Sequence, residues 1–109
     1  MKRKKAKPIL QIDNNIVKVT KYILGPGYET GMHKHKYDYV VTPITRGKLL
    51  IIDKKGEESN FNLLPSKSYF RKSGVEHNVI NNGKKKLIFV ELEFKNKRRS
   101  NEREAKRKL

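Results

Sequence analysis

This 109-residue chain contains three histidines, and their spacing points to metal chemistry. His33 and His35 stand one residue apart in a run that is typical of a β-strand. Side chains alternate along a strand, so residues two apart share a face and their imidazoles can converge on one ion. Such a pair alone proves little, because short motifs often arise by coincidence.

The third histidine favours a real site. His77 lies near the start of another predicted strand, with 41 residues between it and His35. Three neutral imidazoles that hold a divalent ion and leave coordination positions open are typical of a catalytic metal site. The chain has no cysteine, so the ligands must be nitrogen and oxygen atoms. We expect a divalent metal ion, and the residue types leave its identity open among iron, zinc, nickel, manganese and copper.

The elements that must position these histidines are short strands between turns. Turn sequences occur at 13–15 (DNN), 25–27 (GPG), 53–56 (DKKG) and 81–83 (NNG). The runs between them are rich in Ile, Val, Leu, Tyr and Phe, which favours strands. The expected strands are 16–24, 38–45, 48–53, 59–64, 68–71, 77–81 and 86–94. This spacing predicts an all-β, antiparallel fold that is closed or nearly closed, a sandwich or barrel.

The net charge of +16 is concentrated near the two ends of the chain. Residues 2–7 carry five cations, and residues 95–108 carry eight cations and two glutamates, whereas residues 8–94 have a net charge of +5. Blocks of like charge are usually solvated. The ends contain no interleaved aromatic residues and no recognisable nucleic-acid-binding module. Contact with nucleic acid through them is therefore the less favoured interpretation.

These observations divide the chain into three parts. We expect a basic N-terminal tail (1–8), one β-barrel domain (9–94) and a basic C-terminal tail (95–109). In the last part, Glu102 and Lys106 are spaced to pair across one turn of a short helix. The longest apolar run has four residues, far short of the roughly 20 that a membrane-spanning helix needs. We expect a soluble, cytoplasmic protein without a membrane partner.

The histidines and their neighbours resemble the two motifs of the RmlC-like cupin superfamily. The first motif is a Gly, five residues, His-x-His, an acidic ligand further on and a final Gly, and the second ends in Gly-x-x-His-x-x-x-Asn. The matching residues are Gly27, His33, His35 and Gly47 in the first motif, and Gly74, His77 and Asn81 in the second. The resemblance covers about residues 16–94 and is to small single-domain cupins, some of them labelled β-alanine degradation proteins.

The resemblance implies a jelly-roll β-barrel with a metal ion inside, near one mouth, and commonly a homodimer. The chain departs from the family where the acidic ligand should stand, because that position falls on Tyr39 or Val40. Asp38 is the nearest carboxylate, but alternation from His35 turns it to the opposite face. A β-bulge would turn Asp38 inward as a fourth ligand. Otherwise three histidines form the site, Tyr37 or Tyr39 lies near the metal, and Asp38 has a structural role.

Two further side chains matter for the site. Tyr39 lies on the histidine face by alternation, and its phenol could orient a substrate or bound dioxygen, so it is the candidate catalytic residue. Glu91 and Glu93 alternate with apolar residues in the last expected strand, and we assign them to its solvent side.

Two functions fit this sequence. The first is a metal-dependent enzyme, a dioxygenase, isomerase or lyase, that acts on a small anionic molecule; three neutral ligands leave the ion its full positive charge, which favours anions. The second is a non-catalytic cupin that binds a small ligand and whose basic tails contact nucleic acid or another acidic partner.

Overall fold

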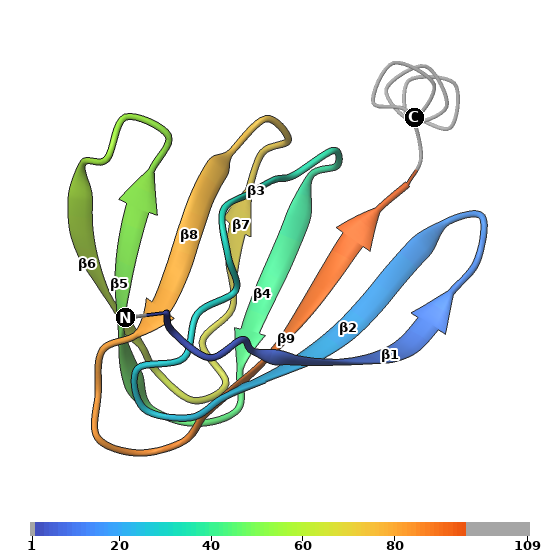
Figure 1. Cartoon of the computed structure of the whole chain (residues 1–109). Helices are drawn as coiled ribbons and strands as arrows, with labels where there is room; N and C mark the ends of the chain where they lie inside the picture. The colour runs from blue at the N-terminus through green and yellow to red at the C-terminus, as the bar shows by residue number, and fades with distance from the viewer. Residues whose placement is uncertain (1, 96–109) are drawn as a thin grey trace.

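The computed structural model describes residues 2–95, which form nine β-strands and no α-helix (Figure 1). The strands are β1 (Lys7–Asp13), β2 (Val17–Leu24), β3 (His33–Lys34), β4 (Tyr39–Pro43), β5 (Gly47–Asp53), β6 (Glu58–Leu63), β7 (Tyr69–Arg71), β8 (Glu76–Asn81) and β9 (Leu87–Phe94). They pair antiparallel in a five-stranded sheet, β1-β2-β9-β4-β7, and a four-stranded sheet, β3-β8-β5-β6. The predicted all-β, antiparallel architecture is confirmed.

Each of the seven strands expected from the sequence corresponds to one strand of the structure, from β2 to β9 without β3. The turn chemistry explains why they end where they do. The side chain of Asn14 accepts hydrogen bonds from the backbone N–H groups of Ile16 and Val17 in the turn before β2. Asp53 does the same for Lys55 and Glu57 between β5 and β6.

The N-terminal residues are part of the β-structure, which differs from the expected boundary at residue 9. Strand β1 begins at Lys7, and the residues before it contact the loop that leads to β3. The N–H of Ala6 donates to the carbonyl of Glu29 at 2.7 Å, and the N–H of Glu29 donates to the carbonyl of Lys4 at 2.9 Å. The basic C-terminal segment from residue 96, with the short helix expected in it, lies outside the described residues.

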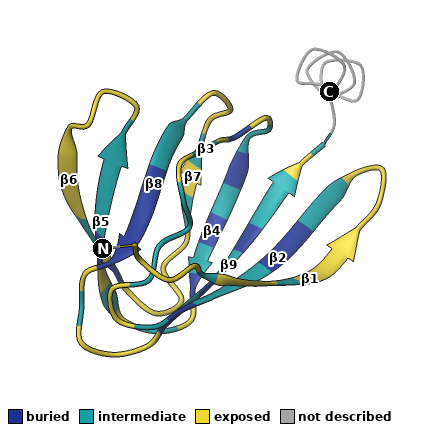
Figure 2. Cartoon of the chain, viewed as in Figure 1, coloured by how far each residue is buried: buried dark blue, intermediate teal, exposed yellow. Residues whose placement is uncertain are grey.

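The core lies between the two sheets and draws on both of them (Figure 2). Its buried cluster consists of Leu24, Tyr39, Val41, Leu49, Leu63, Val79, Leu87 and Phe89. Figure 2 shows buried residues along β4, β8, β9 and β2, whereas β1 and much of β6 are exposed. The core borders the histidine cluster, since the ring of the core residue Tyr39 stacks on the imidazole of His35.

The opposite face of the five-stranded sheet carries an apolar row. Ile12, Val19, Leu92, Val40 and Phe70 are neighbours across all five strands. Two of them are exposed, Ile12 by 47% and Phe70 by 49%. The homodimer that the family resemblance implies stays a prediction.

Within the described part of the chain, no helix has the length and apolar character that a membrane span requires.

Candidate metal site

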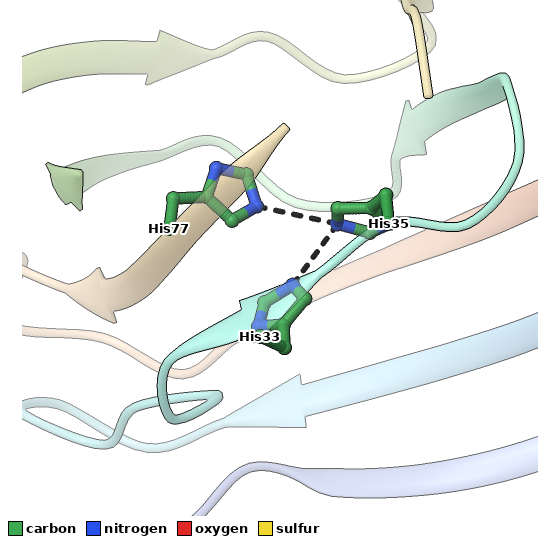
Figure 3. Close-up of side chains that lie close together, drawn as sticks. All are labelled: His33, His35 and His77. Carbon is green, nitrogen blue, oxygen red and sulfur yellow. Dashed lines mark hydrogen bonds between the residues drawn. The ribbon is translucent and has the colours of Figure 1, made fainter. Parts of the chain in front are cut away.

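The three histidines come together at the edge of the four-stranded sheet (Figure 3). His33 on β3 is the direct cross-strand partner of His77 on β8. Backbone hydrogen bonds continue past the end of β3. The N–H of His35 donates to the carbonyl of Val75 at 2.9 Å, and the carbonyl of His35 accepts from the N–H of Gly74 at 2.8 Å. Figure 3 shows the three imidazoles pointing toward one another.

The spacing of the imidazole nitrogens fits one metal ion. The Nε2 atoms of His33 and His35 lie 2.9 Å apart, and those of His35 and His77 lie 3.3 Å apart. An ion with bonds of about 2.0–2.1 Å to nitrogen places neighbouring ligand atoms about 2.9–3.4 Å apart, from octahedral to tetrahedral angles. His35 therefore stands at the separation from each of the other two donors that a shared ion requires, and all three donors lie within 4.8 Å of one another.

A hydrogen bond fixes the tautomer of His33. Its Nδ1 lies 2.7 Å from the carbonyl oxygen of Gly31, which can only accept, so Nδ1 carries the proton. The Nε2 atom then carries a lone pair, which faces the other two histidines. This partner of the non-ligating nitrogen is the usual way in which a protein orients a metal-binding imidazole.

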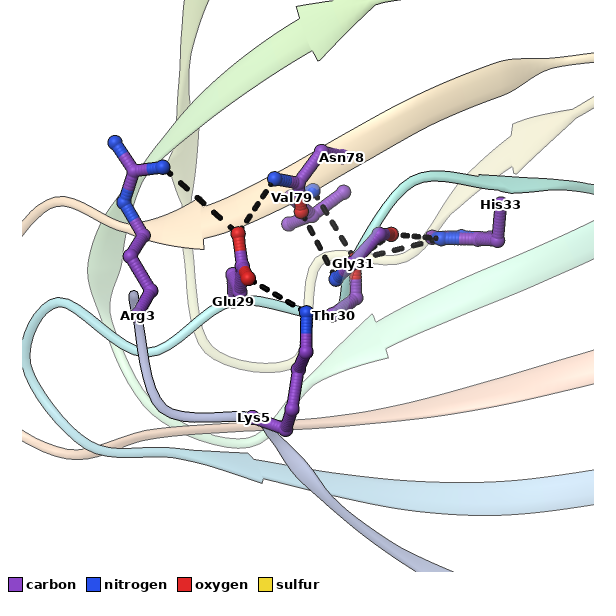
Figure 4. Close-up of polar contacts among 8 residues, drawn as sticks. All are labelled: Arg3, Lys5, Glu29, Thr30, Gly31, His33, Asn78 and Val79. Atoms are coloured by element: carbon purple, nitrogen blue, oxygen red, sulfur yellow. Dashed lines mark hydrogen bonds and ion pairs between the residues drawn. The ribbon is translucent and has the colours of Figure 1, made fainter. Parts of the chain in front are cut away.

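The N–H of Gly31 is held by a polar network that reaches the N-terminal residues (Figure 4). The side chain of Asn78 accepts from the N–H of Gly31 at 3.0 Å and donates to Glu29 at 2.8 Å. The ammonium of Lys5 donates to the other oxygen of Glu29 at 2.6 Å, and Arg3 lies 3.8 Å from that carboxylate. Lys5, followed by Asn78, holds the pKa of Glu29 below its usual range. A chain of contacts thus links two N-terminal cations to the loop of His33.

Removing the charge of Glu29 tests this network. We expect Glu29→Gln to weaken metal binding about tenfold, because partners behind a ligand typically contribute 10- to 100-fold in metal affinity. Competition with a chelator of known affinity measures the change. The matched control is Glu58→Gln, which alters an exposed glutamate on β6. Equal affinity in Glu29→Gln and Glu58→Gln would contradict a role for the network.

Burial keeps two of the imidazoles neutral. Burial, with smaller contributions from neighbouring histidines, lowers the pKa of His35 to about 3. Burial, followed by His33 and Arg71, lowers the pKa of His77 to about 4. Neutral imidazole is the form that binds a metal ion. At pH 7 these two side chains therefore present lone pairs rather than charges.

Glu91 is the residue that the sequence analysis placed wrongly. Its side chain is buried on the histidine side of β9, with an oxygen 4.0 Å from Nδ1 of His35. Burial, with a smaller contribution from Glu93, raises its pKa to about 8. At pH 7 the contact joins two largely neutral groups and is too long for a hydrogen bond, so it is not an ion pair.

The strand register explains this position of Glu91. Side chains alternate along β9, and Leu87, Phe89 and Glu91 all fall on its buried face. Cross-strand pairing with Val41 of β4 places Glu91 against a core residue. Alternation from Leu87 and Phe89 is consistent with this face, but the other face of β9 is apolar as well, so alternation alone does not decide between them.

Asp38 is not brought together with the histidines. The group of possible ligands that the described residues form is His33, His35 and His77. The carboxylate of Asp38 accepts a hydrogen bond from the N–H of Ser73 at 2.8 Å, and its carbonyl accepts from Phe94 at 2.9 Å. These bonds tie the start of β4 to two other segments. They agree with the structural role that was one of the two alternatives for Asp38.

Tyr39 lies where alternation placed it. Of the two tyrosines expected near the metal, Tyr39 stacks on His35, with ring centroids 3.9 Å apart. It is 2% exposed, and its hydroxyl is buried without a hydrogen-bond partner among the described residues. Burial raises the pKa of this phenol well above its usual range. The hydroxyl therefore remains a hydrogen-bond donor at any physiological pH, and its catalytic role stays a prediction.

Known proteins resemble this chain in both sequence and fold. No protein-family model matches it. The β-alanine degradation protein BauB of Pseudomonas aeruginosa is 47% identical over 93 residues, which are 85% of this chain and 97% of BauB. A crystal structure of a cupin domain from Bordetella pertussis is 49% identical, with a TM-score of 0.84 over 88% of this chain and 99% of that one.

A more distant structure shows the same fold. A cupin superfamily protein from Desulfitobacterium hafniense has a TM-score of 0.67 at 9% identity, over 88% of this chain and 83% of that one. The expected jelly-roll fold thus agrees with the relatives that share nearly half of the sequence. The chain belongs to the cupin superfamily, as a short single-domain cupin similar to BauB.

Proposed function

We propose that this chain is a divalent-metal-dependent enzyme that acts on a small anionic substrate. The observation that carries the proposal is the convergence of three Nε2 atoms, with separations of 2.9 Å from His33 to His35 and 3.3 Å from His35 to His77. A divalent ion bound there would polarise a substrate or activate dioxygen at its open coordination positions. Because the imidazoles are neutral ligands, the site would keep a positive charge, which favours an anion.

The side chains around the histidines support a reaction rather than a merely structural ion. His77 and Tyr39 both line a cavity of about 310 Å³. The buried hydroxyl of Tyr39, which has no partner among the described residues, is available to donate a hydrogen bond to a substrate oxygen. His35 stacks on the Tyr39 ring and so holds its position relative to the histidines. We assign Tyr39 the role of orienting the substrate.

The name of the similar Pseudomonas protein suggests which molecules to try first. It is called a β-alanine degradation protein, and β-alanine carries a carboxylate. A three-carbon acid also suits a cavity at the small end of the range for ligand pockets, roughly 300–1,000 Å³. β-Alanine and related three-carbon acids are therefore the first candidate substrates.

Metal analysis followed by a substrate screen tests the proposed function. Protein purified without oxygen should contain about one equivalent of divalent metal per chain, as expected for a single three-histidine site. The metal-loaded protein is then mixed with β-alanine and other three-carbon acids, and dioxygen uptake and product formation are followed by an oxygen electrode and NMR. Failure to bind iron, zinc, nickel, manganese or copper after reconstitution would overturn the proposal.

The alternative function is a non-catalytic cupin whose basic ends contact nucleic acid or another acidic partner. The net charge of +16 is the feature that favours it. Several of the cations near the ends have acidic partners within the chain, because Lys5 and Arg3 pair with Glu29 and Lys95 pairs with Asp13. The three-histidine cluster is the more specific feature, so the enzyme remains the function that we propose.

A further inference from the structure

The cavity beside the histidines is lined by both apolar and polar side chains. Apolar side chains such as Leu49, Ile51 and Val79 make up much of its lining. Arg71 is the one lysine or arginine among the lining residues within 2–95. A ligand in this cavity would therefore meet His77 of the histidine cluster, an apolar wall and a single guanidinium.

Strand pairing places Arg71 on the same face as the histidine cluster. Arg71 ends β7 and is the direct cross-strand partner of Tyr39, the residue that stacks on His35. Side chains of such a pair lie on one face of the sheet, with Cβ atoms about 4.5–5.5 Å apart. The guanidinium is also close enough to His77 to contribute to the lowering of its pKa. Arg71 and the metal site are thus neighbours across one cavity.

Two aromatic rings hold the Arg71 side chain in place. Its guanidinium carbon lies 4.6 Å from the ring centroid of Tyr69 and 5.4 Å from that of Phe61. One of its nitrogens, Nη1, donates to the carbonyl of Phe70 at 2.9 Å. These contacts hold the guanidinium in place before any ligand binds. Its other N–H donors take no part in the bond to Phe70 and can bind a ligand.

No carboxylate forms an ion pair with Arg71 among residues 2–95. Glu91 lines the same cavity, but its contact is with His35. Arg71 is partly exposed, so its unused donors can exchange water for an anionic ligand. The planar fork of arginine matches a carboxylate with two parallel hydrogen bonds.

We propose that Arg71 recognises the carboxylate of the substrate and that the substrate is a small carboxylic acid of a few carbon atoms. This inference rests on the proposed function, since it names the substrate class of the same site. The carboxylate is held by the guanidinium, the hydrocarbon part contacts the apolar wall, and the other end of the molecule faces the histidines. Arg71 is thus a specificity-determining residue.

Binding of matched probes to zinc-loaded protein tests this inference, because zinc has no redox chemistry that would consume the probe. The probes are propanoate and propanamide, which have nearly the same shape but differ in charge. Isothermal titration calorimetry should show tighter binding of propanoate. Arg71→Gln should weaken propanoate binding about ten- to a hundredfold, the range for a hydrogen bond to a charged group. Arg71→Lys should restore part of the loss, because it keeps the charge but not the fork.

Two controls make the result specific. Lys72→Gln removes an exposed cation next in sequence and should leave propanoate affinity unchanged. The propanamide affinity of Arg71→Gln should equal that of the wild type, which shows that the cavity is intact. The inference is overturned if the wild type binds the two probes equally, if it binds no propanoate, or if Arg71→Gln binds propanoate as tightly as the wild type.

The outcome also separates this inference from the proposed function. If zinc binds at about one equivalent but Arg71→Gln has no effect on propanoate, the choice of Arg71 is wrong and the metal site stands. If no metal binds to the wild type, the proposed function fails. The same titration on metal-free protein then still decides whether Arg71 binds carboxylates.

Discussion

Replacing His35 with alanine is expected to abolish metal binding. The Nε2 atom of His35 lies between those of His33 and His77, at 2.9 and 3.3 Å, so the variant loses the central donor of the cluster. Its metal content after reconstitution and desalting should fall from about one equivalent per chain to less than about a tenth, because two histidines alone do not make a typical protein metal site. Inductively coupled plasma mass spectrometry measures this content.

Thermal unfolding gives a second measure of the same loss. A metal ion that binds the folded protein alone stabilises it by about 2.7 kcal/mol when its free concentration is 100 times the dissociation constant. We expect added zinc to raise the melting temperature of the wild type and not that of His35→Ala. This readout compares each protein with and without metal, so a general loss of stability in the variant does not affect it.

Asp38→Ala is the control that separates the two ligand sets considered from the sequence. The carboxylate of Asp38 accepts a hydrogen bond from Ser73 and is not among the clustered ligands of the described residues. The variant should therefore keep its metal, although the lost hydrogen bond costs about 1 kcal/mol of stability. Loss of metal from Asp38→Ala as complete as from His35→Ala would contradict the three-histidine site.

The sequence predicted most of the fold because local signals and tertiary structure agree along most of the chain. Alternating apolar runs bounded by Asx turns predicted the seven longer strands from β2 onward. Strand β1 escaped prediction for a physical reason. It is an edge strand that is exposed along almost its whole length, so its residues K-P-I-L-Q-I-D show no buried face. Its place is set by pairing with β2, which a local pattern does not reveal.

The site was predictable where it depended on side-chain type and spacing. His33, His35 and His77 were recognised because three imidazoles in this pattern are typical of a metal site with open coordination positions. Their convergence also depends on the direct pairing of His33 with His77, which links segments far apart in the sequence. The site was not predictable where it depended on which face of a strand is buried.

Glu91 illustrates this second limit. Both faces of β9 carry apolar residues, so a carboxylate at Glu91 can be assigned to either face from the sequence alone. Charge favours the solvent side, whereas the register with β4 places the side chain inside. The energetic cost of burying this group is visible in its raised pKa. A buried carboxyl beside a metal-binding imidazole is a feature that stability alone does not explain.

The pH dependence of stability should reveal the buried carboxyl of Glu91. Burial raises its pKa from 4.5 to about 8, so between these values the folded protein keeps a proton that the unfolded chain releases. The contribution of Glu91 to stability therefore falls as pH rises through this range. Below pH 6.5 the sign reverses, because the unfolded chain binds protons at His35 and His77 whereas the folded protein, with pKa values of about 3 and 4, does not.

The metal-free wild type should consequently be most stable near pH 6.5 and lose about 1 kcal/mol of unfolding free energy between pH 6.5 and 8, since one group contributes at most about 1.4 kcal/mol per pH unit and residual protonation of the unfolded histidines offsets part of it. Glu91→Gln should abolish the loss above pH 6.5 while keeping the fall below it. Chemical denaturation between pH 5 and 8.5 measures both limbs. Glu57→Gln, an exposed glutamate, is the matched control and should follow the wild type. A Glu91→Gln profile that declines above pH 6.5 as steeply as the wild type would show that another group titrates there, and that Glu91 is already ionised beside His35 in the folded protein.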